Sequence, residues 1–456
     1  MKKPNFLIII ADDCTYNDLA IYGGRNVRTP HIDRLAREGM VFTRAYLSVA
    51  MCLPCRTELY TGLYPARSGA CWNHSAARPG TLSIVHHLRA LGYRVGLAGK
   101  KHVSPATSFP FEDVPGITGN CVAEVTYFDP AGIREFMACD GDEPFCLVVG
   151  LVEPHCPWTM GDYEHFDQAA LELPPYMADT AATRRDYAKY LAEIEVLDER
   201  VGQTLAALDQ SGQADNTLVI FTSEQGAQFP GCKWTNWDTG VHTGFIVRWP
   251  GRVEPGRRTD AMIQYADVAP TLVEAAGGDP DACGFDGTSF LSVLLGESDR
   301  HRDFAYFMHN NIPEGPPYPI RSVTDGTYHY IRNLIPDALY IEKHLMGESR
   351  WHDYWPSWLF DSTFNEHTRA LVYRYMRRPP EQLYRLDEDP FEMNNLADDP
   401  EHADAKDRLS AELDRWIAEQ GDPGASIDTK EQWEAARRGN HFTLEKVRAE
   451  ASLGSP

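Results

Sequence analysis

Four short and almost wholly apolar runs constrain the fold of this chain more than any other feature of its sequence. They occupy residues 6–11, 93–98, 145–151 and 217–222. Runs of this length without polar alternation are typical of parallel strands that are buried on both faces. Helical patterns separate them, at 29–36, 81–91 and 184–208. The alternation predicts an α/β fold, with a large, open, mostly parallel sheet sandwiched by helices.

The pattern changes after about residue 296. The segments 301–308, 320–331 and 382–386 are predicted to be antiparallel strands, and 404–420 is predicted to be a helix. Because 456 residues exceed what one core normally supports, we expect two domains, 1–296 and a smaller α+β domain at 297–456. An aromatic stretch at 351–360 is interpreted as a lid or an interface, and the polar tail beyond residue 422 as an arm.

Charged and polar side chains directly follow the apolar runs. Asp12 and Asp13 follow the first, Lys100 and His102 the second, His155 the third, and Glu224 and Gln225 the fourth, with Lys233 a little further on. Ligands of open parallel sheets bind beyond the carboxyl ends of the strands, so we expect these groups to meet. The oxygen ligands favour a hard metal ion. The formal charge of −23 argues against nucleic acid or an anionic membrane as the main partner.

A second motif is Cys52-Leu53-Pro54-Cys55-Arg56, closed by Thr61-Gly62. A C-x-x-C pair can bind zinc, act as a redox couple, or simply be buried. The chain has no second C-x-x-C and no H-x3-5-H partner for zinc, and no short βαβ unit typical of redox domains surrounds the pair. The ten cysteines show no spacing framework, which favours free thiols.

The C-x-P-x-R motif with Thr61-Gly62, and the order of the strand-end groups, resemble the type I, formylglycine-dependent sulfatases of the alkaline phosphatase superfamily. Within that family, Gly99-Lys100-Lys101-His102-Val103 and Tyr318-Pro319-Ile320-Arg321-Ser322-Val323 are similar to segments of the N-sulfoglucosamine sulfohydrolases, the sulfamidases. The resemblance extends over nearly the whole chain and implies an alkaline phosphatase-like fold.

The resemblance also implies a role for each site residue. Cys52 would be oxidised to formylglycine, whose hydrated aldehyde is the nucleophile, and would bind calcium together with Asp12, Asp13, Glu224 and Gln225. The catalytic side chains around the sulfate would be Arg56, Lys100, His102, His155 and Lys233, and further substrate contacts are expected from His309 and Arg321. The chain departs from the family at Glu224-Gln225, where Asp-Asn or Asp-His is usual, and at Lys233, where sulfamidases have arginine.

The expected activity is hydrolysis of a sulfated saccharide, at the N-sulfate of glucosamine as in heparan sulfate. An O-sulfatase, a phosphonate or phosphodiester hydrolase, and a non-catalytic sulfated-sugar-binding protein with unconverted Cys52 are the alternatives. A formylglycine-generating maturation enzyme is the implied partner, and a homodimer is expected because two-fold oligomers are the commonest. Residues 1–13 lack the pattern of a signal peptide, so the expected location is the cytoplasm, with the periplasm as the alternative if a leader was removed.

Overall fold

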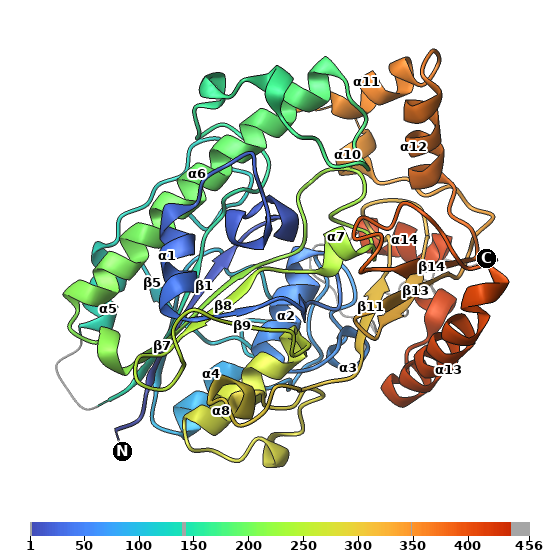
Figure 1. The fold of residues 1–456 in the computed structure, drawn as a ribbon. Coiled ribbons are helices and arrows are strands. Elements are labelled where there is room, and N and C mark those ends of the chain that lie inside the picture. Colours follow the sequence, from blue (N-terminus) through green and yellow to red (C-terminus); the bar gives the residue numbers. More distant parts are fainter. Residues whose placement is uncertain (1, 139–142, 348, 439–456) are drawn as a thin grey trace.

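The computed structural model describes residues 2–138, 143–347 and 349–438. Figure 1 shows a large central sheet between layers of helices, with a smaller sheet beside it. In spatial order the large sheet contains β5 (Glu112–Val114), β4 (Arg94–Gly99), β6 (Phe145–Gly150), β1 (Asn5–Ala11), β7 (Thr217–Ser223), β8 (Phe245–Arg248), β2 (Met40–Phe42) and β9 (Arg257–Thr259). Among these strands only β8 runs antiparallel to its neighbours, which confirms the predicted mostly parallel sheet.

Alternate residues of β1 enter two different core layers. Leu7 and Ile9 pack in the layer of α1 (Pro30–Glu38) and α6 (Ala181–Gln210), whereas Phe6, Ile8 and Ile10 pack in the layer of α4 (Ile84–Ala90) and α8 (Val268–Ala275). Because helices cover both faces, the strand has no polar side, which explains its continuous apolar sequence. None of the described helices is both long enough and apolar enough to cross a membrane.

The smaller sheet is antiparallel and contains β11 (Ala305–His309), β12 (Ile320–Thr324), β13 (Tyr328–Asn333) and β14 (Glu381–Arg385). Helix α13 (Ala403–Gln420) covers it with Leu409, Leu413 and Trp416. The single strand predicted at 320–331 was wrong, because Gly326 adopts a left-handed conformation (φ +83°) and turns the chain into a hairpin. The domain boundary at 296/297 stays a prediction.

Two further segments contain helices that the sequence analysis did not predict. The aromatic stretch contains α11 (Tyr354–Asp361), which packs on α6 with Trp355 and Trp358 buried; the Trp358 indole donates a hydrogen bond to Thr183 Oγ1 at 2.7 Å. The predicted arm beyond residue 422 instead includes the packed helix α14 (Lys430–Arg437), and buried Asp428 accepts backbone N–H groups. The rest of that arm, 439–456, lies outside the described residues.

Candidate active site

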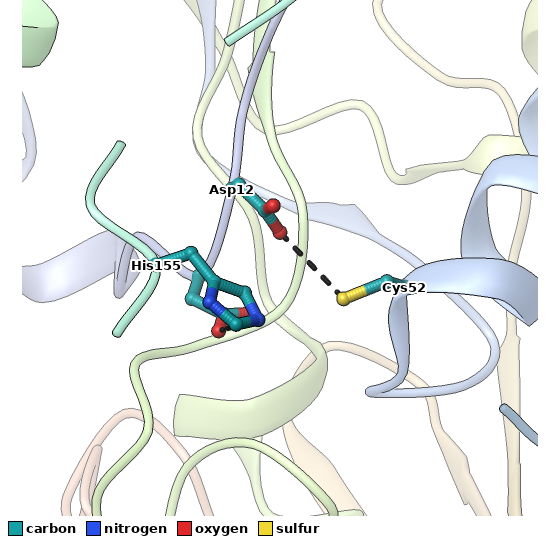
Figure 2. Close-up of side chains that lie close together, drawn as sticks. Asp12, Cys52 and His155 are labelled. Carbon is teal, nitrogen blue, oxygen red and sulfur yellow. Dashed lines mark hydrogen bonds and ion pairs between the residues drawn. The ribbon is translucent and has the colours of Figure 1, made fainter. Parts of the chain in front are cut away.

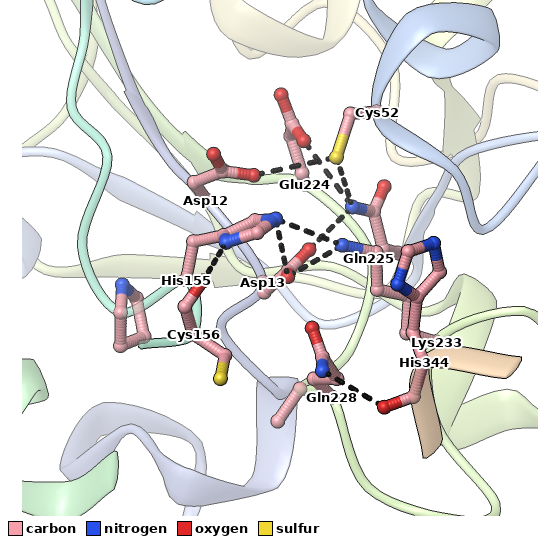
Figure 3. A network of polar contacts seen from close by, with 12 residues as sticks. Asp12, Asp13, Cys52, His155, Cys156, Glu224, Gln225, Gln228, Lys233 and His344 are labelled. Atoms are coloured by element: carbon pink, nitrogen blue, oxygen red, sulfur yellow. Dashed lines mark hydrogen bonds and ion pairs between the residues drawn. The ribbon is translucent and has the colours of Figure 1, made fainter. Parts of the chain in front are cut away.

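The central strands bring the predicted polar groups to one edge of the sheet. Strands β4, β6, β1 and β7 are parallel neighbours, so their carboxyl ends lie side by side. Figure 3 shows how the loops that leave three of them, β1, β6 and β7, place their polar side chains around one point. The groups are Asp12 and Asp13 after β1, Lys100 after β4, His155 after β6, and Glu224 and Gln225 after β7.

Cys52 is the first residue of α2 (Cys52–Thr61) and points into this cluster. Its Sγ lies 3.6 Å from Asp12 Oδ1 and accepts a hydrogen bond from Gln225 Nε2 at 3.2 Å. Figure 2 shows the thiol directed at Asp12, with the His155 ring nearby. The side chain is almost completely buried. The helix therefore presents one nucleophilic atom to the carboxylates at the sheet edge.

Cys55 is not a disulfide partner of Cys52. Its thiol lies 3.2 Å from the Cys52 carbonyl and 3.4 Å from Gln225 Oε1. All nine cysteines in the described part of the chain are free. Cys55 therefore supports the Gln225 side chain, a contact that the C-x-P-x-R motif alone did not indicate.

Three buried cations pair with the three buried carboxylates of the cluster. Lys233 Nζ lies 2.6 Å from Asp13 Oδ2, while Arg56 pairs with Glu224 and Lys100 with Asp12. Arg56 Nη1 also donates to the Lys100 carbonyl at 2.7 Å. All six side chains are at most 2% exposed. Such dense buried charge costs desolvation energy and is typical of functional sites.

The cluster changes the acidity of its members. Burial opposes ionisation of Asp12, but Lys100, His155 and Arg56 hold its pKa well below the usual value. Burial raises the pKa of Glu224 to about 8, and Arg56 offsets this only in part. Burial, together with Glu224, raises the pKa of the Cys52 thiol to about 11. At neutral pH the unmodified thiol is therefore protonated and a poor nucleophile.

The two predicted histidines differ in charge. Burial opposes protonation of His155, yet neighbouring Cys121, with Asp13 and Asp12, raises its pKa well above the usual value. Its Nδ1 donates to the Cys156 carbonyl at 2.5 Å, so Nε2, 3.3 Å from Lys233 Nζ, is the nitrogen directed into the cluster. Burial and Lys100 lower the pKa of His102 well below its usual value. At neutral pH, His155 can donate a proton and His102 cannot.

Backbone strain is concentrated at the same place. Asp13, His102 and Trp234 have φ values of 61°, 40° and 63°. Residues other than glycine rarely adopt these left-handed conformations, which cost about 1–3 kcal/mol each. Packing around the site maintains them, as expected where side chains must be aimed accurately.

The donor set fits a hard divalent cation. Asp12, Asp13 and Glu224 offer carboxylate oxygens, and an amide oxygen is available from Gln225. The Gln225 Nε2 lies 2.6 Å from Asp13 Oδ1 and 3.2 Å from Glu224 Oε2, which places an N–H donor where these oxygens converge. Rotating the amide by half a turn would present its oxygen instead. The raised pKa of Glu224 also fits a cation site, because a bound cation would stabilise the negative charge of this carboxylate.

A cavity of about 150 Å³ opens onto the cluster. Cys52, His102, His155 and Lys233 line it, together with Trp351 of the aromatic stretch interpreted as a lid or an interface. The lining also contains residues for which no role was predicted: Asn73, His74, Cys121, Val122, Cys156, Gln228, Trp234, Glu314 and His344. Cys156, Gln228 and Trp234 lie in the same loops as the predicted residues, after β6 and β7, whereas Glu314 and His344 come from the smaller domain. Asp12, Asp13, Arg56, Lys100, Glu224 and Gln225 lie beneath the lining.

The structure does not bring His309 and Arg321 to this cavity. Both side chains are fully buried. Arg321 forms a bidentate ion pair with Asp422, and its Nη1 donates to the His309 carbonyl at 3.1 Å. Both residues therefore make structural contacts in the smaller sheet, and the structure does not place them where they were expected, in contact with the substrate.

Comparison with known proteins shows the family to which the chain belongs. The sulfatase family matches residues 4–278, and the family described as N-sulphoglucosamine sulphohydrolase, C-terminal, matches 233–334. An ulvan-active sulfatase of Formosa agariphila is 31% identical, over 92% of this chain and 81% of that protein. The human N-sulphoglucosamine sulphohydrolase is 27% identical, over 92% of this chain and 91% of its own length.

A solved structure in complex with its substrate D-glucosamine-2-N,6-O-disulfate has the same fold, with a TM-score of 0.68 at 19% identity, covering 92% of this chain and 99% of that one. The fold and the site together define an alkaline phosphatase-like enzyme with a buried thiol at a helix start beside buried carboxylates. The chain belongs to the sulfatase family, which confirms the family predicted from the sequence motifs.

Proposed function

We propose that this protein hydrolyses the N-sulfate of a glucosamine saccharide, with Cys52 as the precursor of its nucleophile. The observation that carries the proposal is the convergence of Cys52, three buried carboxylates and three buried cations at one small cavity. The cations explain how a negatively charged protein can bind a negatively charged sulfate. An anionic sulfate can enter a protein of net charge −23 because Lys233 and His155 line the cavity that receives it.

Each side chain has a distinct task in this proposal. When present, a formylglycine at position 52 supplies a hydroxyl nucleophile, and calcium held by Asp12, Asp13, Glu224 and Gln225 supplies positive charge beside it. Lys233 binds and orients the sulfate oxygens. Arg56 and Lys100 hold Glu224 and Asp12 in place through their ion pairs. Sulfuryl transfer depends mainly on such positioning and charge stabilisation, as phosphoryl transfer does.

His155 is the proposed general acid. The leaving nitrogen needs a proton as the bond to sulfur breaks, and a positioned acid contributes roughly 10²–10⁴-fold to such a step. Nε2 of His155 is directed towards Lys233, the sulfate-binding cation, at 3.3 Å. His102, the other candidate, is buried next to Lys100, which keeps its pKa low and its ring neutral.

Support for the N-sulfate comes from the family match over residues 233–334 and from the human relative that covers nearly the whole chain. A second candidate is an O-sulfate ester of a saccharide. The relative named an ulvan-active sulfatase, at 31% identity, supports a substrate other than N-sulfoglucosamine. Lys233 affects the choice between the two substrates. A lysine ammonium offers a single point charge, whereas the arginine that sulfamidases have at this position would bind two sulfate oxygens at once.

The decisive experiment uses protein co-expressed with a formylglycine-generating enzyme. Conversion of Cys52 lowers the intact mass by about 18 Da. Converted protein is then assayed with N-sulfoglucosamine, an O-sulfated sugar, an aryl sulfate and an aryl phosphonate, with Cys52→Ala as the control. We expect the highest kcat/KM for N-sulfoglucosamine and no turnover by the variant. Activity of Cys52→Ala equal to that of the converted protein would refute the nucleophile, and a preference for the O-sulfate would refute the substrate.

A further inference from the structure

A buried carboxylate lines the cavity but has no part in the sulfate chemistry described above. Glu314 lies between β11 and β12 and is 2% exposed. Its Oε2 is 2.8 Å from both Lys343 Nζ and His344 Nε2. Its Oε1 faces His74 Nε2 at 3.7 Å, which is too far for a hydrogen bond. One oxygen of Glu314 is thus engaged, and the other is placed to accept a further donor.

The ligand group at Glu314 cannot be the sulfate, because two anions would repel each other. A carboxylate oxygen accepts hydrogen bonds, and sugar hydroxyls are neutral donors that suit it. Aromatic rings accompany it: Trp351 lines the same cavity, and the Trp234 indole stacks on the His344 ring with centroids 5.5 Å apart. Apolar rings with a few placed polar groups are the usual lining of a small-molecule pocket.

The same indole connects this carboxylate with the cationic part of the site. Lys233 Nζ lies 4.6 Å from the centroid of the Trp234 ring, which His344 also contacts. The cavity of about 150 Å³ is smaller than the roughly 300–1,000 Å³ of pockets for drug-sized ligands. Its size suits one saccharide ring that reaches from the cations to the carboxylate.

We infer that Glu314, with His344, recognises hydroxyl groups of the saccharide ring whose sulfate is bound by Lys233 and His155. The inference rests on the proposed function and identifies the residues of that site that bind the sugar ring. It also assigns different functions to the segments around the two sheets. Loops of the large sheet supply the sulfate chemistry, whereas the β11–β12 connection and α10 (Lys343–Met346) supply specificity for the sugar.

The test compares Glu314→Gln with the wild type on two substrates. N-sulfoglucosamine has ring hydroxyls, and 4-nitrophenyl sulfate has none. Loss of a hydrogen bond to a charged group is expected to lower kcat/KM for the sugar roughly 10- to 100-fold. Hydrolysis of the aryl sulfate should stay within about 3-fold of the wild type. Free glucosamine should also inhibit aryl sulfate hydrolysis more weakly in the variant.

Lys343→Ala is the matched control. Lys343 pairs with the same carboxylate but does not line the cavity, so this variant disturbs α10 without removing the acceptor. An equal loss of sugar hydrolysis in Lys343→Ala, or parallel losses on both substrates in Glu314→Gln, would overturn the inference. If the wild type hydrolyses only the aryl sulfate, the proposed substrate fails. The inhibition constants for glucosamine then decide, and equal values in the wild type and Glu314→Gln overturn the role of Glu314.

Discussion

The site is built on side chains whose charge is set by their immediate neighbours. Cys52 illustrates this, because burial and Glu224 raise its thiol pKa to about 11 in the very place where a nucleophile is needed. The geometry is right for attack, but the thiol is in the wrong protonation state. Conversion to a hydrated aldehyde would place a hydroxyl beside the proposed calcium ligands, where a bound cation would lower its pKa. The proposed catalytic role of Cys52 therefore depends on its modification.

His155→Gln should lower kcat for N-sulfoglucosamine roughly 10²–10⁴-fold, because the leaving nitrogen would lose its proton donor. The raised pKa of His155 keeps the acid form present at neutral pH, so the wild-type rate should fall on the alkaline side as the proton is lost. The variant should lack this alkaline decline. The measurement is a pH profile of kcat.

The control for this prediction is His165→Gln, an exposed histidine away from the cavity, which should keep the wild-type profile. An aryl sulfate provides a second comparison. Its leaving group is already acidic and needs little protonation, so His155→Gln should slow it much less. An unchanged alkaline decline in His155→Gln would show that another group is the acid.

At the scale of elements, buried ion pairs fasten the smaller sheet to the segments around it. Arg321 in β12 pairs with Asp422, which directly follows α13, and both side chains are fully buried. Arg321→Met would leave a buried carboxylate without its partner, and we expect the free energy of unfolding to fall by about 3–5 kcal/mol. KM should not change. Urea unfolding and steady-state kinetics test the two statements.

This prediction also separates two roles for Arg321. The double variant Arg321→Met/Asp422→Asn should recover part of the stability, because the unpaired charge is gone. A raised KM with unchanged stability would instead support the substrate-binding role that was expected from the sequence.

A second buried pair makes stability depend on pH. Asp267 accepts two hydrogen bonds from Arg302, at 2.9 and 2.6 Å, and one from the Gln264 backbone at 2.8 Å. Burial opposes its charge, but Arg302 and His301 hold its pKa well below the ordinary value of 3.8. A lowered carboxylate pKa stabilises the fold above the unfolded pKa, and this contribution is lost as the pH falls through the folded value.

Asp267→Asn should therefore be less stable than the wild type at pH 7, and the difference should shrink below about pH 4. Urea unfolding at a series of pH values measures it. The exposed Asp303→Asn serves as the control and should follow the wild-type curve. A difference between Asp267→Asn and the wild type that is constant across the pH range would contradict the assignment.

For the molecule as a whole, the sequence predicted those site residues whose position follows from the order of strands in the sheet. It did not predict residues that only the packing of the two sheets brings to the site. Parallel strands must end at one edge, so the meeting of Asp12, Lys100, His155 and Glu224 followed from their positions after apolar runs. The turn at Gly326 was predictable too, because Asp-Gly is a strong hairpin signal, yet it was overlooked. Glu314 could not be found this way. It reaches the cavity from a loop of irregular sequence, and only the packing of the two sheets brings it there.

Calcium should stabilise the whole molecule, because its proposed ligands follow two separate strands, β1 and β7, and meet only when the chain is folded. In Cys52→Ala, which has no turnover, adding calcium after chelation with EDTA should raise Tm. At about 1,000 times Kd the gain in unfolding free energy is roughly 4 kcal/mol. Asp13→Asn in the same background should lose most of the shift. Magnesium should give a smaller shift, because it demands stricter geometry and holds its water more tightly. An equal Tm with calcium and with EDTA would show that the three carboxylates are neutralised by Arg56, Lys100 and Lys233 alone.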